Sequence, residues 1–171
     1  VQEWVGLTNY QRLFTDELFW NALRVTFIFA IVSVIAQMLL GYWAAAALLN
    51  DTWLNRIVRS IFFFPTIVAL ATIGLVWRFL LDPSIGLIGG ITAALGAEPI
   101  PWLQDTALAL PTVIFVSVWK NLGFTMVILL AGLTGVPQHL YEAGRLDGAN
   151  ERQLTWHVTL QSIRPTLLFT T

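Results

Sequence analysis

The sequence predicts an all-α integral membrane protein, a polytopic helical bundle, on three observations. Of its 171 residues 57% are hydrophobic and only 11% are charged, whereas soluble domains carry roughly 25% charged residues. Residues 25–50 contain no charged side chain, and about 20 apolar residues are enough for a helix to cross a hydrocarbon core of roughly 30 Å. Similar apolar stretches recur further along the chain, which favours several crossings and extensive contact with membrane lipid.

Composition also excludes some classes of function. The net charge of −1 lacks the basic excess that nucleic-acid phosphates demand, so we expect no nucleic-acid partner. The absence of cysteine excludes disulfides, thiolate metal sites and cysteine nucleophiles. The chain begins with Val1, and residues 167–171 stop without a helix-ending signal, so we expect a fragment of a longer protein.

Three membrane spans and the start of a fourth are expected within one transmembrane domain, residues 1–171. The spans cover about 19–49, 61–81 and 107–134, and another begins near 165. A helix over residues 19–50 would be about 48 Å long, so it must tilt, protrude or break near Gly41. In the second span, Pro65 favours a kink or a late helix start.

The connecting segments predict an orientation. Residues 82–105 are rich in Gly and Pro and free of Lys and Arg, which indicates a surface excursion with one short interfacial helix. The segments 51–60 and 135–165 carry most of the arginines: Arg56, Arg59, Arg145, Arg152 and Arg164. The positive-inside rule therefore places both in the cytoplasm and residue 1 outside it.

The cytoplasmic segment 135–164 is the most polar part of the chain, and its pattern predicts a helix, a tight turn and a second helix. Pro137 suits the first turn of a helix that runs to about Leu146. Gly148 favours a positive φ that ends this helix, and Asn150 with Gln153 forms a capping-box pattern. On the first helix Leu140, Ala143 and Gly144 form a small-residue side, and on the second Trp156, Leu160 and Ile163 recur on one face. Patterns alone leave two readings open, a solvated loop and a docking surface.

This segment resembles the EAA loop of binding-protein-dependent ABC importer permeases. The family pattern is Glu-Ala-Ala, a glycine four residues beyond the last alanine, nine further residues and Ile-x-Leu-Pro. The sequence has "EAGRLDGA" from Glu142 and "VTLQ" from Val158, so it departs by Gly144 for Ala, Val158 for Ile and Gln161 for Pro. Four further phrases resemble the maltose and glycerol-phosphate relatives that take up carbohydrates: "GLTNYQRLF" at 6–14, "FFFP" at 62–65, "WRFLLDPSIGLI" at 77–88 and "VWKNLGFTMVILLAGL" at 118–133.

The resemblance implies the fold of a type I ABC importer permease in a prokaryotic inner membrane. It implies two ATPase subunits, which hold ATP and Mg, a second permease in a heterodimer, an extracytoplasmic solute-binding protein, and a sugar or related small solute. No cofactor is expected in this chain itself. By carry-over, the ATPase-docking residues are Glu142, Ala143, Gly144, Asp147, Gly148 and Ala149.

Lys120 interrupts the third span, where a charge is costly unless it faces a cavity or a partner. It could line a substrate path with Trp119, Asn121 and Phe124, since aromatic faces and polar donors suit sugar rings and hydroxyls. It could equally bond helix carbonyls of the partner permease.

Catalytic and metal-binding roles are not expected. His139 and His157 lack metal-ligand spacing, and the chain has no P-loop for ATP, so we expect no enzyme activity. A fragment of an ion-coupled secondary transporter is the main alternative. Such carriers place Asp, Glu or His within spans, and the expected spans contain none. A structural membrane subunit remains a further alternative.

Overall fold

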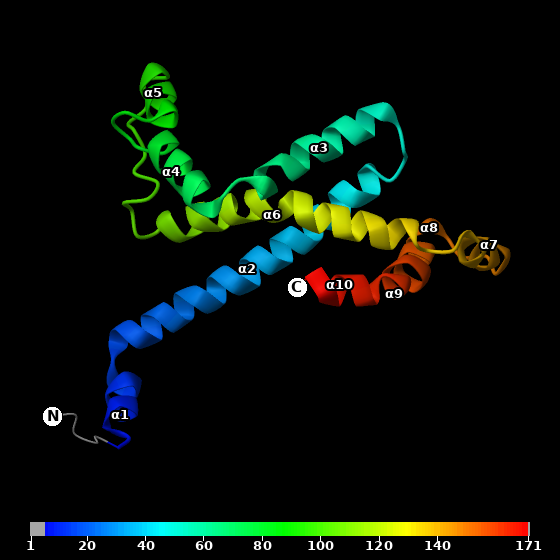
Figure 1. The fold of residues 1–171 in the computed structure, drawn as a ribbon, viewed down its shortest axis with the longest axis horizontal. Helices are drawn as coiled ribbons and strands as arrows, with labels where there is room; N and C mark the ends of the chain where they lie inside the picture. The colour runs from blue at the N-terminus through cyan, green and yellow to red at the C-terminus, as the bar shows by residue number, and fades with distance from the viewer. Residues whose placement is uncertain (1–5, 171) are drawn as a thin grey trace.

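The computed structural model describes residues 6–170, so Val1 and Thr171, on which the expectation of a fragment partly rests, lie outside the described residues. Within this range every regular element is helical, which confirms the all-α fold class (Figure 1). The elements are α1 (Thr8–Thr15), α2 (Glu17–Ala47), α3 (Trp53–Ile67), α4 (Leu70–Leu80), α5 (Leu87–Ala94), α6 (Ala109–Thr134), α7 (Gln138–Leu146), α8 (Glu151–Leu154), a π-helical turn η1 (Thr155–Thr159), α9 (Leu160–Ser162) and α10 (Arg164–Thr170).

Helix α6 is the centre of the bundle, and α2, α3 and α10 all pack on it. The α2 crossing lies at Gly41, where an added Cβ would stand 2.6 Å from Thr125 Cγ2. The glycine is therefore a point of close packing, and α2 continues through it for 31 residues without the break that was one of the expected outcomes. At 1.5 Å per residue α2 is about 46 Å long, which leaves tilting or protrusion as the way to fit a bilayer.

The second expected span differs from the prediction. Its first helix starts at Trp53, inside the segment expected to be a loop, and Pro65 lies near the end of α3. The late helix start is therefore wrong, whereas the kink, the other outcome expected from Pro65, is found just after it. After Ile67 the chain bends by 97° into α4. Before the break α3 packs closely on α6 at Gly123, where a Cβ would collide with the Phe62 carbonyl oxygen and lie 2.6 Å from Phe63 Cα.

The α2–α3 connection is held by Arg59. Its guanidinium donates to the carbonyl oxygen of Leu48, the C-cap of α2, and at 3.1 Å to that of Asn50 in the connection. Asp51 lies 3.6 Å from the same guanidinium. A cation at a helix C-terminus is favoured by the helix dipole, so this hairpin is fixed by a side chain that the sequence analysis used only as a topology signal.

The segment 82–105 does contain one short helix, α5. Asp82 and Asp105 each accept two backbone N–H bonds, from Ser84 and Ile85 and from Ala107 and Leu108. Both carboxylates therefore act as turn caps at the borders of this segment. In Figure 1, α1 and α5 lie toward one end of the molecule, and α7 lies at the other.

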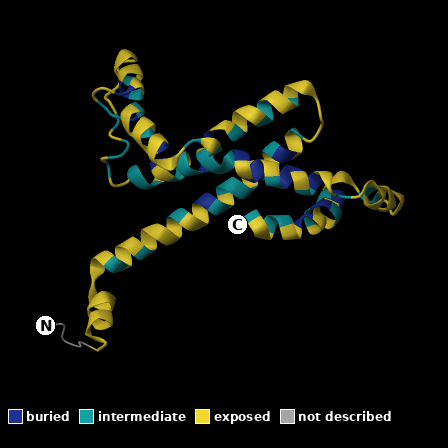
Figure 2. Cartoon of the chain, viewed as in Figure 1, coloured by how far each residue is buried: buried dark blue, intermediate teal, exposed yellow. Residues whose placement is uncertain are grey.

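After the polar segment, α10 returns along α6, where Gly132 faces Thr166 with an added Cβ only 2.9 Å from Thr166 Oγ1. The buried core lies around the C-terminal half of α6 and consists of Ala45, Met126, Leu129, Leu130, Leu133 and Ile163. Much of the apolar surface of the long helices is exposed (Figure 2). Within the described residues α2 and α6 are long and apolar enough to cross a membrane, and α3 with α4 adds a third crossing if the bent pair is one span.

Candidate functional site

The polar segment forms a helix, a tight turn and a second helix, as the sequence indicates. Pro137 directly precedes α7, which begins at Gln138. Gly148 has φ +80°, and two bonds close the turn, Gly148 N–H to Arg145 O at 3.1 Å and Ala149 N–H to Gly144 O at 2.9 Å. This pair of bonds is a Schellman motif, in which glycine supplies the left-handed residue. The turn between the two helices therefore has one defined geometry.

The second helix starts with the capping box that the spacing predicts. The Asn150 side chain accepts from the Gln153 N–H at 2.9 Å, and the Gln153 side chain accepts from the Asn150 N–H at 2.8 Å. Two free donors of the helix start are thus satisfied inside the segment. The shape of the turn depends on local bonds and needs no membrane.

The second helix is not regular, and the expected apolar face is wrong. A π-helical turn, η1, occupies Thr155–Thr159, and it shifts the register of the residues that follow. Trp156 is 68% exposed whereas Ile163 is 1% exposed, so the two do not share a face. Thr159 in this turn bonds its Oγ1 to the Tyr141 hydroxyl at 2.9 Å, which ties η1 to α7. Such π turns occur often at functional sites.

The residues predicted for docking fall into two groups. Glu142, Ala143, Asp147 and Gly148 are exposed, while Gly144 and Ala149 are half-buried. Gly144 packs within the chain, since an added Cβ would lie 2.6 Å from Leu154 Cδ2. The small size of Gly144, which was expected to allow close docking of a partner, therefore also allows the contact between α7 and α8. Docking by these six residues stays a prediction.

A shallow groove of about 380 Å³ lies between the end of α7 and the second helix. Four of the predicted docking residues line it, together with side chains of α8 and η1: Gly144, Asp147, Gly148, Ala149, Gln153, Leu154, His157 and Val158. The structure thus brings these four together on one concave surface. Glu142 lies outside the lining, and its carboxylate accepts a hydrogen bond from Gln138 at 3.1 Å.

Leu146 is a residue of this region that the sequence analysis did not single out. It ends α7 and is 90% exposed, next to the predicted docking residues Asp147 and Gly148. An isolated exposed leucine is ordinary, yet one at the tip of a polar helix offers an apolar anchor to a partner. The signal in the sequence is a large apolar residue between Arg145 and Asp147.

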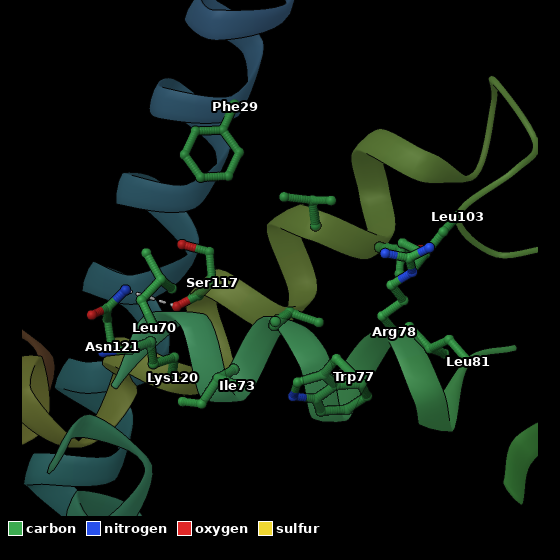
Figure 3. A pocket seen from close by; sticks show the side chains of 14 residues that line it. Phe29, Leu70, Ile73, Trp77, Arg78, Leu81, Leu103, Ser117, Lys120 and Asn121 are labelled. Carbon is green, nitrogen blue, oxygen red and sulfur yellow. Dashed lines mark hydrogen bonds between the residues drawn. The ribbon is translucent and has the colours of Figure 1, made fainter. Parts of the chain in front are cut away.

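A second candidate site is a cavity of about 600 Å³ between α4 and α6 (Figure 3). Lys120 and Asn121, two of the predicted substrate-path residues, line it, as do Ser117 and Trp77. Asn121 donates to the Ser117 carbonyl oxygen at 2.9 Å. Trp119 and Phe124 are not in the lining, although Trp119 stacks edge-on against Trp77 with ring centroids 5.4 Å apart. The structure therefore brings together two of the four, and their role in a substrate path stays a prediction.

Arg78, in the last turn of α4, also lines this cavity. The backbone carbonyl of Lys120 accepts a hydrogen bond from Thr66 Oγ1 at 3.0 Å, which fixes α3 on α6 beside the cavity. Among residues 6–170 no group of His, Cys, Asp or Glu could hold a metal ion.

A bundle of broken and continuous apolar helices that carries one capped, polar helix pair is the architecture of an integral membrane protein. The chain belongs to the family of binding-protein-dependent transport system inner membrane components, whose profile matches residues 37–171. This membership confirms the resemblance carried by the EAA-like loop.

Relatives of known name agree with this family. The chain is 36% identical, over 94% of its length and 49% of the relative's, to the diacetylchitobiose uptake system permease protein NgcF of Streptomyces coelicolor. It is 34% identical to the probable ABC transporter permease protein YurN of Bacillus subtilis (91% and 55% coverage). It is 32% identical to the sn-glycerol-3-phosphate transport system permease protein UgpA of Agrobacterium fabrum (96% and 56%). The chain thus spans about half the length of the curated relatives it matches.

Two solved structures share the fold. A chain of a bacterial alginate ABC transporter in complex with an alginate-bound periplasmic protein matches with a TM-score of 0.83 at 23% identity, over 95% of this chain and 57% of that one. A chain of a bacterial ABC transporter for import of the acidic polysaccharide alginate matches with a TM-score of 0.80 at 26% identity (98% and 59%). The permease-type helical bundle expected from the resemblance is therefore confirmed.

Proposed function

We propose that the chain is part of the transmembrane permease subunit of an ATP-driven importer, and that it couples ATP hydrolysis to movement of the membrane helices. The observation that carries this proposal is the capped segment from α7 to η1, which bears the EAA-like residues. Family membership supports it, as does the clustering of arginines in residues 51–60 and 135–165, which the positive-inside rule assigns to the cytoplasm.

The segment from α7 to η1 is linked to α6 at both of its ends, which suits the transmission of movement. Only Gly135, Val136 and Pro137 separate α6 from α7, and η1 leads through α9 into α10, which packs back on α6. A displacement of α7 is therefore passed to α6 from both sides. Because its own bonds hold the segment in shape, it can move as a body, which a two-state interface requires.

The partners follow from this role. Two ATPase subunits dock on Glu142, Ala143, Gly144, Asp147, Gly148, Ala149 and their equivalents, and they hold the ATP and Mg that this chain has no P-loop to bind. A second permease completes the path as a heterodimer, and an extracytoplasmic binding protein delivers the solute. The location is the inner membrane of a prokaryotic cell, crossed several times.

The proposed substrate is a sugar or a related solute. Relatives that are about a third identical to the chain over the aligned residues are named for uptake or transport of diacetylchitobiose, trehalose and maltose, or glycerol-3-phosphate. The cavity beside Lys120 and Asn121 lies between helices at the level of the third expected span, where a translocation path would run, with Trp119 and Phe124 as neighbouring candidates.

The test uses the full-length protein, purified with the products of its neighbouring genes and reconstituted in vesicles. Ala143 is exposed on α7, so Ala143→Trp should prevent the ATPase subunits from docking there and abolish ATP-dependent uptake. Ala93→Trp, an exposed alanine of α5 at the other end of the molecule, is the matched control and should leave uptake unchanged. Equal uptake by both variants would contradict docking on α7, and uptake independent of ATP would contradict the importer.

A further inference from the structure

The cavity between α4 and α6 carries two cations and no acid. Its lining includes Arg78 from the last turn of α4 and Lys120 from the middle of α6, and no Asp or Glu is among the lining residues. In Figure 3, Arg78 lies toward Leu103, and Lys120 lies beside Asn121 on the opposite side of the view. The two charges therefore lie at different parts of one cavity. The apolar side chains of Ile73 and Trp77 also line this cavity.

Neither cation is neutralised within the part of the chain that the structure describes. The ion pairs found there are Arg56 and Arg59 with Asp51, and Arg145 with Glu151. The acids closest in sequence to the cavity, Asp82 and Asp105, accept backbone N–H bonds of their turns through Oδ1, and neither is in an ion pair with Arg78 or Lys120. Lys120 lies within the third expected span, where a cation is costly unless a partner charge or a water-filled cavity compensates it.

We propose that this cavity takes an anionic solute, one carrying a carboxylate or a phosphate ester, with Arg78 and Lys120 as its counter-charges. The inference rests on the proposed function and narrows its substrate class. A single lysine does not argue for an anion, because it could bond helix carbonyls. Two unpaired cations on one cavity raise the local concentration of anions, and low-dielectric walls strengthen the effect. Asn121 and Ser117 add polar groups suited to hydroxyls, and Trp77 adds an aromatic face.

The absence of native cysteine in the chain allows a direct test of the sign of this potential. Ser117→Cys places one thiol in the cavity of the full-length complex, with cysteines of the rest of the protein and of the other subunits distinguished by peptide mass. The probes are an anionic reagent, sulfonatoethyl methanethiosulfonate, and a cationic one, trimethylammonioethyl methanethiosulfonate. Each rate is divided by the rate with a free thiol. The matched control is Ala93→Cys on the exposed surface of α5.

The expected result is a normalised preference for the anionic reagent of about tenfold or more at Ser117→Cys and near one at Ala93→Cys. Adding Lys120→Met or Arg78→Met should lower the preference several-fold, whereas Lys120→Arg should keep it, which separates lost charge from lost folding. A preference near one, or for the cation, would overturn the proposal, because carboxylates from elsewhere would then neutralise the cavity. A thiol that neither reagent reaches would overturn it as well, since the cavity would be filled by protein.

ATP-dependent uptake by the unsubstituted complex is measured in parallel. If uptake occurs and the preference is absent, the importer stands and the anionic substrate fails. If no ATP-dependent uptake occurs, the proposed function itself fails, whatever the charge of the cavity.

Discussion

The α6 crossings and the segment from α7 to η1 are held in shape by different means. At the crossings, glycines allow backbones to touch, as at Gly123 against Phe62. In the polar segment, side chains satisfy the free ends of helices, as Asn150 and Gln153 do. In lipid, helix association depends on close packing, so the crossings should be sensitive to added volume. The polar segment depends on local bonds, so it should keep its shape while the helices around it move.

The largest effect is expected at the α3–α6 crossing. Gly123→Ala places a methyl group against the Phe62 carbonyl, a backbone atom that cannot turn aside. We expect a loss of about 3 kcal/mol, the upper end for overpacked sites, seen as a lower unfolding temperature and a poor yield of the full-length complex. The matched control is Gly90→Ala on α5, where an added Cβ meets nothing within 4 Å. Equal stability of the two variants would contradict the close crossing.

The next effect is expected at the turn of the polar segment. Gly148→Val puts a β-branched residue at φ +80°, which costs about 1–2 kcal/mol. We expect ATP hydrolysis to continue while uptake per ATP falls several-fold, because the segment no longer passes movement as a body. Gly148→Asn tolerates this φ better and should retain most of the coupling. Unchanged uptake in Gly148→Val would remove the turn from the coupling mechanism.

A smaller effect is expected at the start of α8. Asn150→Ala removes one half of the capping box and should cost about 1 kcal/mol. Hydrogen exchange of the amides around Gln153 should accelerate about fivefold, while α6 keeps its protection. If α6 exchanged faster as well, the segment would not be an independent unit, and the contrast between the two regions would weaken.

The smallest effect is expected for the ion pair between Arg145 and Glu151, 3.2 Å apart with side chains 59% and 81% exposed. Exposed pairs contribute about 0.2–1 kcal/mol, and salt screens them. Glu151→Gln should therefore change the unfolding temperature of the full-length protein by less than Asn150→Ala does, and the difference should vanish at high salt. A salt-independent loss would mean that this pair is part of the segment's rigid framework.

The polar segment could be predicted from the sequence more completely than the helix crossings on α6. The turn at Gly148 and the cap at Asn150 were predictable, because each depends on residues within five positions. A kink near Pro65 was predictable from the proline itself. The close contact of α3 with α6 at Gly123 was not, because it joins residues some 60 positions apart in the sequence. The register shift in η1 was missed for a similar reason, since Thr159 bonds to Tyr141 across the turn.

The candidate sites follow the same rule. The predicted docking residues are one continuous stretch, so four of them share a groove. The cavity lies between α4 and α6. That Arg78 and Lys120 line the same cavity depends on tertiary packing, which no local pattern reveals. Trp119 and Phe124 lie outside the lining of this cavity. Trp119 is a direct neighbour of Lys120 and points in another direction, whereas Phe124 lies on nearly the same face one turn further along α6.

The most direct test of the account is a single cysteine at Ala143 in the full-length protein, crosslinked in native membranes, with the captured protein identified by mass spectrometry. We expect the cysteine at Ala143 to capture a P-loop ATPase, and an equally accessible cysteine at Ala93 to capture less of it. If the cysteine at Ala143 reacts with a soluble thiol reagent yet captures only lipid or the permease itself, the segment from α7 to η1 is a solvated connector. The proposed coupling would then be contradicted.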